Sequence, residues 1–143
     1  MKRLILILFF VIAVVHIIAG YFDWYDSIWY LDDLLHFSGG VWVALFFIYF
    51  AFVKNHIFGD NTHFFTKLII FLGFVALVGV LWEFYEYLAD VYLLKRHPLN
   101  FAPNPLVLPD TLFDLFLDLL GSVTAASLGL IYLKRKLDSK SVS

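Results

Sequence analysis

The chain alternates between long apolar segments and short polar ones. Four segments stay apolar over about 20 residues, the length that a helix needs to cross the hydrocarbon core of a bilayer. The strict alternation of apolar and polar positions that marks membrane β-strands is not seen. The pattern predicts an all-α integral membrane protein, a bundle of four transmembrane helices over residues 4–22, 34–53, 66–89 and 111–133.

The composition supports a single membrane domain over residues 1–143. Hydrophobic residues make up 62% of the chain, whereas soluble domains contain roughly 45–50%. The absence of cysteine excludes disulfides and thiolate metal sites. The few basic residues lie at the ends of the apolar segments, so we expect membrane lipids as partners and no nucleic acid. Small residues at four-residue spacing, such as Gly121 and Ala125, allow close helix packing and are compatible with a homodimer.

The first apolar segment shares one feature with a secretory signal peptide. Lys2 and Arg3 precede it, as a positively charged region precedes the apolar core of such a peptide. The apolar run is longer than that core, and no Ala-x-Ala-like cleavage site follows it. We therefore expect the first segment to be an uncleaved helix.

The basic residues predict how the bundle is oriented. Lys and Arg accumulate in short loops on the cytoplasmic side of membrane proteins. Eight of the ten basic residues fall on one side of the predicted bundle. We therefore expect both termini inside, in the cell (inner) membrane, with Lys95 and Arg96 on the outer side. The eight residues are Lys2, Arg3, Lys54, Lys67, Lys134, Arg135, Lys136 and Lys140.

Acidic residues lie inside two of the apolar segments and open a third, and no Lys or Arg lies at their depth to pair with them. An ionised carboxylate in the hydrocarbon region costs about 2.5–3.5 kcal/mol on insertion scales. In the predicted orientation, all these acids and one histidine lie in the outer third of the bilayer. Their spacing within each segment places them on one helix face. The group consists of Asp32, Asp33, His36, Glu83, Glu86, Asp110, Asp114 and Asp118.

Several carboxylates beside one imidazole suit a divalent metal ion. Hard oxygen ligands favour Mg²⁺, Mn²⁺ or Ca²⁺, and the imidazole also admits Zn²⁺ or iron. We predict that Asp32 and Asp110 support the site without binding the ion, Asp32 by orienting His36. Two alternatives remain open: Asp32 and Asp33 as N-caps of the second helix, and Asp110 as the N-cap of the fourth. The predicted metal ligands are His36, Glu83, Glu86, Asp114 and Asp118.

Other polar and aromatic positions have simpler interpretations. We interpret His16, in the outer half of the first segment, as a packing residue. Lys95 and Arg96 are either solvated or hold a phosphate headgroup of the substrate. The aromatic stretch 21–30 is typical of an interfacial belt or a short amphipathic helix, with contact to a lipid substrate as the alternative. Residues 90–110 contain four prolines and are expected to be irregular.

Three motifs together resemble those of the VanZ-like superfamily. They are D-D-L-L-H-F-S-G-G at 32–40, W-E-F-Y-E at 82–86 and D-T-L-F-D-L-F-L-D-L-L-G at 110–121. Their order, spacing and depth are similar to those of the YjdF-type inner-membrane branch, over roughly residues 30–130. One branch of the superfamily is associated with glycopeptide-antibiotic resistance, so the resemblance points to the cell envelope.

The chain carries more acidic residues than that pattern. Asp33 stands where a lysine often follows the first aspartate, and Glu86 and Asp118 stand where amides are common. The extra carboxylates strengthen the interpretation as a metal site, because a divalent ion offsets their mutual repulsion.

Three functions fit these features. The first is a metal-dependent enzyme, a hydrolase or phosphatase, acting on a lipid or lipid-linked envelope substrate at the outer leaflet, with Asp33 or Glu86 as general base. The second is transport or sensing of a cation or proton, although the inner halves of the third and fourth segments carry few polar residues. The third is a structural protein whose protonated acids join the helices. We favour the first.

Overall fold

The computed structural model describes residues 1–59, 61–93 and 107–141, and most of these residues are helical. Four helices are long and apolar enough to cross a membrane, which confirms the predicted all-α bundle. A short helix follows the first span, inside the aromatic stretch 21–30. The elements are α1 (Lys2–Tyr21), α2 (Trp24–Ser27), α3 (Leu31–Ile48), η1 (Tyr49–Lys54), α4 (Phe64–Leu88), η2 (Ala89–Leu93) and α5 (Val107–Ser141), of which η1 and η2 are π-helical.

The second span begins earlier than its apolar run. α3 starts at Leu31, after Tyr30 as the N-cap, and no side chain caps it. The alternative that made Asp32 and Asp33 N-caps is therefore wrong, because both lie inside the first turn. Negative charge is favourable at that place, since the N-terminal end of a helix carries a partial positive charge. Neither carboxylate is used in capping, so a cap does not account for them.

The last span also begins before the predicted residue. α5 starts at Val107, so Asp110 lies in its first turn and is not the N-cap. Pro109 suggested an irregular chain up to residue 110. A proline in the first helical turn leaves the helix intact, because the first four N–H groups have no partner within the helix. Residues 90–93 of the segment expected to be irregular are also helical, within η2, and residues 94–106 lie outside the described residues.

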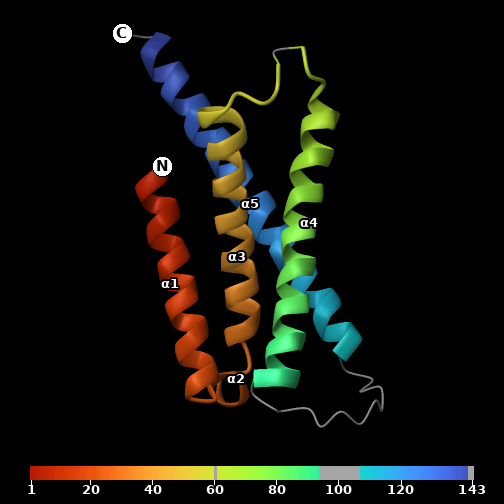
Figure 1. Cartoon of the computed structure of the whole chain (residues 1–143). Coiled ribbons are helices and arrows are strands. Elements are labelled where there is room, and N and C mark those ends of the chain that lie inside the picture. The colour runs from red at the N-terminus through yellow and green to blue at the C-terminus, as the bar shows by residue number, and fades with distance from the viewer. Residues whose placement is uncertain (60, 94–106, 142–143) are drawn as a thin grey trace.

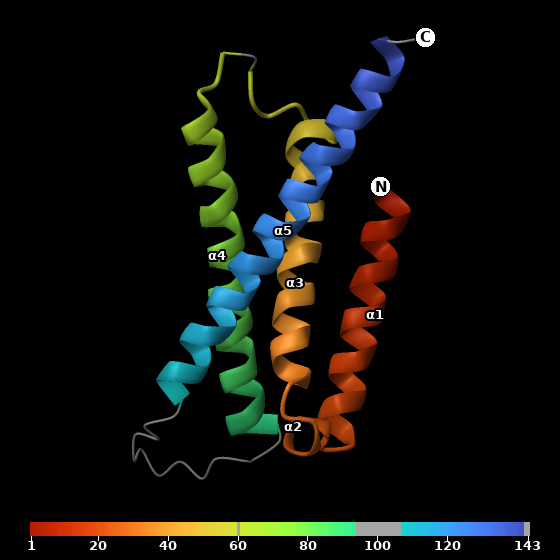
Figure 2. The same cartoon turned by 180° about the vertical axis from the view of Figure 1, so that it is seen from behind.

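Three spans stand side by side and the fourth crosses behind them. α3 lies between α1 and α4, and α5 runs obliquely across α3 and α4 (Figures 1 and 2). The two termini lie at one end of the bundle, and α2 lies at the other (Figure 1). Four spans place both termini on the same side of a membrane, as the distribution of basic residues requires.

Glycines allow α3 and α5 to form the most extensive helix–helix contact in the described residues. A Cβ at Gly40 of α3 would collide with the backbone carbonyl of Asp118. A Cβ at Gly121 of α5 would collide with the backbone carbonyl of Phe37. Only glycine permits backbones to approach this closely. The close contact brings Asp118 up to the helix that carries His36.

An apolar core fills the bundle toward the end that holds the termini. Its buried side chains come from α3, η1, α4 and α5 and include Val43, Phe47, Phe71, Val75 and Ala125. The rings of Phe47 and Phe71 meet edge to face, with their centroids 5.5 Å apart. Three of the four buried polar side chains of the described residues instead gather toward the opposite end, namely His36, Asp114 and Asp118.

A hydrogen bond joins α1 to α3. The indole N–H of Trp42 donates to the carbonyl of Ile5 at 2.9 Å. Replacing Trp42 by phenylalanine keeps an aromatic ring but removes the donor, so we expect the free energy of unfolding to fall by about 0.5–1.5 kcal/mol. Thermal unfolding in detergent measures the change. Trp29→Phe is the matched control, because Trp29 is 83% exposed; equal stability of the two variants would contradict the assigned bond.

Candidate metal centre

The site is built around His36, one and a half turns into α3. The imidazole is almost fully buried, with 2% of the side chain exposed. It points toward acidic side chains from three helices, because the i, i+4 spacing of Asp32 and His36 puts both on the face of α3 that meets α4 and α5. We call the imidazole and its five carboxylates the His36 cluster. Its members are Asp32, His36, Glu83, Glu86, Asp114 and Asp118.

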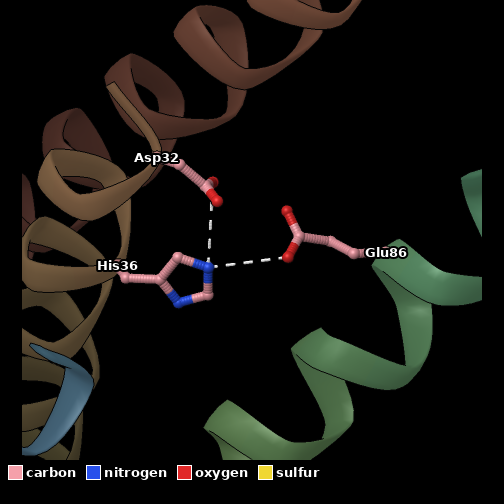
Figure 3. A group of neighbouring side chains, drawn as sticks. All are labelled: Asp32, His36 and Glu86. Carbon is pink, nitrogen blue, oxygen red and sulfur yellow. Dashed lines mark ion pairs between the residues drawn. The ribbon is translucent and has the colours of Figure 1, made fainter. Parts of the chain in front are cut away.

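Four carboxylates surround one nitrogen of the imidazole. They come from α3, α4 and α5, and two of them are drawn in Figure 3. All four oxygens stand 3.5 Å or more from Nε2, which is too far for a strong hydrogen bond. The distances from Nε2 are 3.9 Å to Asp32 Oδ1, 3.7 Å to Glu83 Oε1, 3.5 Å to Glu86 Oε2 and 4.0 Å to Asp114 Oδ1.

The fifth carboxylate lies on the other side of the ring. Asp118 Oδ1 is 3.6 Å from Nδ1 of His36. Glycines surround this carboxylate: a Cβ at Gly79 of α4 would lie 2.5 Å from its Oδ2, and one at Gly39 would lie 3.7 Å from its Oδ1. Asp114 and Asp118, one turn apart on the oblique α5, therefore stand on opposite sides of the imidazole.

Three polar atoms of the His36 cluster are buried without a hydrogen-bond partner. They are Nε2 of His36, Oε1 of Glu83 and Oδ2 of Asp118. A buried polar atom that lacks a partner is costly, and native proteins contain few of them. Even a protonated imidazole offers a single positive charge to five carboxylates. A positively charged ligand would satisfy both the unpartnered atoms and the excess of negative charge.

The spacing of the ligand atoms fits a divalent metal ion. Two groups qualify, Asp32 with His36 and Glu86, and His36 with Glu83 and Asp114, and the atoms of each group lie within 4.8 Å of one another. An ion bound at 2.0–2.2 Å would separate adjacent ligand atoms by roughly 3.0–3.5 Å and opposite ones by roughly 4.0–4.4 Å. The observed separations of 3.5–4.0 Å from Nε2 lie close to this range.

Some residues singled out in the sequence do not join the His36 cluster. Asp33 is half-buried and forms no ion pair with any described side chain. Asp110 is exposed in the first turn of α5. Lys95 and Arg96, the predicted headgroup ligands, lie outside the described residues.

The structure adds two side chains that the sequence did not connect with the site. Nδ1 of His16 in α1 and the Tyr25 hydroxyl are hydrogen-bonded at 2.5 Å, and the His16 ring packs against Trp82 of α4. Both His16 and Tyr25 line a cavity whose wall also includes Asp32 and His36. His16 therefore does pack, as interpreted, but it packs beside the His36 cluster. The only signal in the sequence was its depth, in the outer half of the first span.

Comparison with known proteins assigns the chain to a family. A family model described as "Predicted membrane protein (DUF2238)" matches residues 1–135. An uncharacterized protein of Thermotoga maritima is 32% identical over 121 residues, and the match covers 84% of this chain but only 57% of that protein. No solved structure matches the chain. The resemblance to the VanZ-like superfamily fits a small membrane protein and stays a prediction. The chain belongs to the DUF2238 family of predicted membrane proteins.

Proposed function

We propose that this protein is a metal-dependent membrane enzyme that acts on a lipid or lipid-linked envelope substrate at the outer leaflet of the inner membrane. One observation carries the proposal. A buried imidazole nitrogen without a hydrogen-bond partner faces four carboxylates from three helices, in a region where ionised acids are costly. A divalent ion bound there would polarise a carbonyl or phosphoryl oxygen or lower the pKa of a water.

The geometry favours exchanging the roles that the sequence suggested for Asp32 and Asp118. Asp118 Oδ1 faces Nδ1 of His36 at 3.6 Å, so its negative charge favours the tautomer with the proton on Nδ1, and that tautomer leaves the Nε2 lone pair free for the ion. Asp32 faces Nε2 and belongs to one of the two metal-binding groups. Asp118 is therefore the residue that orients His36, and Asp32 is a ligand. Glu83, Glu86 and Asp114 keep the ligand role that the sequence suggested.

A substrate would reach the His36 cluster from the side of its more exposed carboxylates. Asp114 is buried, with 5% of its side chain exposed, whereas Glu86 and Asp32 are 25% and 35% exposed. Glu86 also lines the cavity between α1, α3 and α4. Glu86 therefore combines two roles: it is a ligand of the ion and, on the open side of the cluster, the carboxylate that takes a proton from an attacking water. Asp33, the other base suggested by the sequence, has no contact that supports this role.

A transport function finds less support. A cation crossing the membrane would need polar groups between the His36 cluster and the end of the bundle that holds the termini. In the described residues, the bundle below the cluster is filled by apolar side chains such as Phe47, Phe71 and Val75. Ser122 is buried there, but its hydroxyl already donates to the carbonyl of Leu119 at 2.7 Å. The His36 cluster is therefore a one-sided site.

The exchange of roles predicts unequal effects of two conservative substitutions. Asp118→Asn removes the orienting carboxylate but no metal ligand, so we expect Mn²⁺ or Zn²⁺ affinity to fall about 10–100-fold. Asp114→Asn replaces a ligand and should lower the affinity further. Titration calorimetry on both purified variants measures the difference. A larger loss for Asp118→Asn than for Asp114→Asn would restore Asp118 as the ligand.

The function itself is tested with vesicles of phosphatidylethanolamine and phosphatidylglycerol that also contain dodecyl phosphate. We expect release of fatty acid or inorganic phosphate that requires Mn²⁺ or Mg²⁺ and stops with EDTA. Glu86→Gln should lower the rate by about a hundredfold or more, because general bases contribute at least that much. Movement of Mn²⁺ into the vesicles without any product would favour transport. A structural role would be favoured if the wild type forms no product and the Asp114→Asn and Asp118→Asn variants, without metal, are as stable as the wild type.

A further inference from the structure

An apolar cavity of about 110 Å³ adjoins the His36 cluster. It lies between α1, α3 and α4, and Asp32, His36 and Glu86 form part of its wall. Most of the remaining wall is hydrocarbon or aromatic ring. The apolar side chains include Ile12, Ala13, Leu35, Val75, Val78 and Trp82. The cavity is therefore apolar along most of its surface and acidic at the edge that it shares with the metal centre.

One face of α1 closes the cavity. Phe9, Ile12, Ala13 and His16 line it, and their spacing of three and four residues places them on a single helix face. The neighbouring Val14 points away and is 50% exposed. α1 packs mainly on α3 and α2. The space between α1 and α4 is thus bounded by side chains without being filled by them.

The size and lining of the cavity select a hydrocarbon occupant. Water needs about two to four polar partners, and away from the edge formed by the His36 cluster, His16 and Tyr25 the cavity wall offers none. An engineered apolar cavity of about 150 Å³ stays dry and accepts benzene, so a cavity of this size suits a group of about four to six carbons. At this depth in a bilayer, the molecules that reach the cavity are lipids.

We propose that the cavity binds the first carbons of the substrate's hydrocarbon chain while the polar group of the substrate occupies the metal centre. This inference rests on the proposed function and narrows the substrate class. Because the cavity and the His36 cluster share wall residues, the reacting group must be bonded directly to the chain. An alkyl or prenyl phosphate, or an acyl ester at its carbonyl, meets this condition. The bond between a phospholipid's glycerol and its headgroup does not meet it, because the glycerol separates that bond from the hydrocarbon chain.

The test uses dodecyl phosphate that carries a photoreactive diazirine on one of its first carbons, added to the full-length protein in detergent. Labelled residues are located by mass spectrometry, and metal content is measured on the same samples. We expect labels on the cavity wall in α1, α3 and α4. Ala13→Phe should lower this labelling by about tenfold or more, because the added ring would occupy the space that the hydrocarbon chain needs. Val78→Phe, which fills the cavity from α4, is the second variant, and Val14→Phe on the exposed face is the matched control.

The outcomes separate this inference from the proposed function. The cavity is supported as the chain-binding site if both Ala13→Phe and Val78→Phe lose the cavity labelling, while their metal content and the labelling of Val14→Phe stay unchanged. Labelling spread evenly over lipid-facing residues and unaffected by Ala13→Phe and Val78→Phe would overturn the pocket and leave the metal centre standing. Cavity labelling that depends on Ala13 in a protein that binds no metal would keep the pocket and overturn the metal-dependent enzyme.

Discussion

Replacing His36 by glutamine is expected to remove divalent-metal binding from the protein. His36 supplies the nitrogen partner in every ion pair found among the described residues. A glutamine amide occupies similar space but offers no imidazole lone pair to an ion. Residues that merely orient a ligand are already worth about 10–100-fold in affinity, so loss of the ligand should weaken Mn²⁺ or Zn²⁺ binding by more than about a hundredfold. Titration calorimetry on the purified variant measures the loss.

His63→Gln is the matched control for this experiment. His63 is exposed and lies before the first residue of α4, at the end of the bundle away from the His36 cluster. We expect its metal affinity to equal that of the wild type. Equal weakening in both variants would mean that the titration reports surface histidines, and an unchanged affinity in His36→Gln would remove the imidazole from the site.

Replacing Gly121 by alanine is expected to unpack α5 from α3. The added Cβ would collide with the backbone carbonyl of Phe37, which cannot move aside as a flexible side chain would. The two helices must therefore separate, and the carboxylates of Asp114 and Asp118 must move away from His36. Overpacking typically costs 1–3 kcal/mol, so we expect a loss of about 3 kcal/mol or more where backbone meets backbone. Thermal unfolding in detergent measures the stability, and a metal titration of the same sample measures the site.

Gly73→Ala provides the matched control on α4. A Cβ at Gly73 meets nothing within 4 Å, so the substitution should leave the packing intact. Alanine also favours a helix over glycine by about 1 kcal/mol. We therefore expect Gly73→Ala to be as stable as the wild type or more so. A Gly121→Ala protein that matches it in both stability and metal affinity would contradict the close contact of α3 with α5.

The sequence predicted the four spans because membrane crossing depends on length and hydropathy alone. It also indicated which acids gather, since depth and helical spacing put His36, Glu83 and Asp114 at one level and on single helix faces. The starts of α3 and α5 were harder to predict. An aspartate or a proline near a helix start fits a cap, a first turn or a loop equally well, and tertiary packing decides among them.

The roles within the His36 cluster could not be read from the sequence. Asp114 and Asp118 form one stripe on α5, which suggests that both do the same thing. The oblique crossing of α5 places them on opposite sides of the imidazole, one at 4.0 Å from Nε2 and the other at 3.6 Å from Nδ1. That angle depends on Gly40 and Gly121, whose close contacts no local pattern specifies.

Two glycines of α4 show the same limit. Gly73 and Gly79 each lie three residues from Ala76, a spacing at which small residues allow helix packing, and nothing in the sequence distinguishes them. Only Gly79 faces another helix closely, next to the Asp118 carboxylate, whereas Gly73 faces open space. Spacing identifies a face of a helix, but the neighbour that the face meets is a property of the assembled bundle.

The central claim is that the His36 cluster binds a divalent metal ion, and elemental analysis of the purified wild-type protein tests it most directly. The protein is incubated with Mg²⁺, Mn²⁺, Ca²⁺ and Zn²⁺ in turn and freed of excess ion before measurement. We predict close to one ion of a preferred metal for each chain, and a strongly reduced content in Glu83→Gln, which loses a ligand while keeping the fold. A wild-type protein that retains none of the four metals would contradict the account.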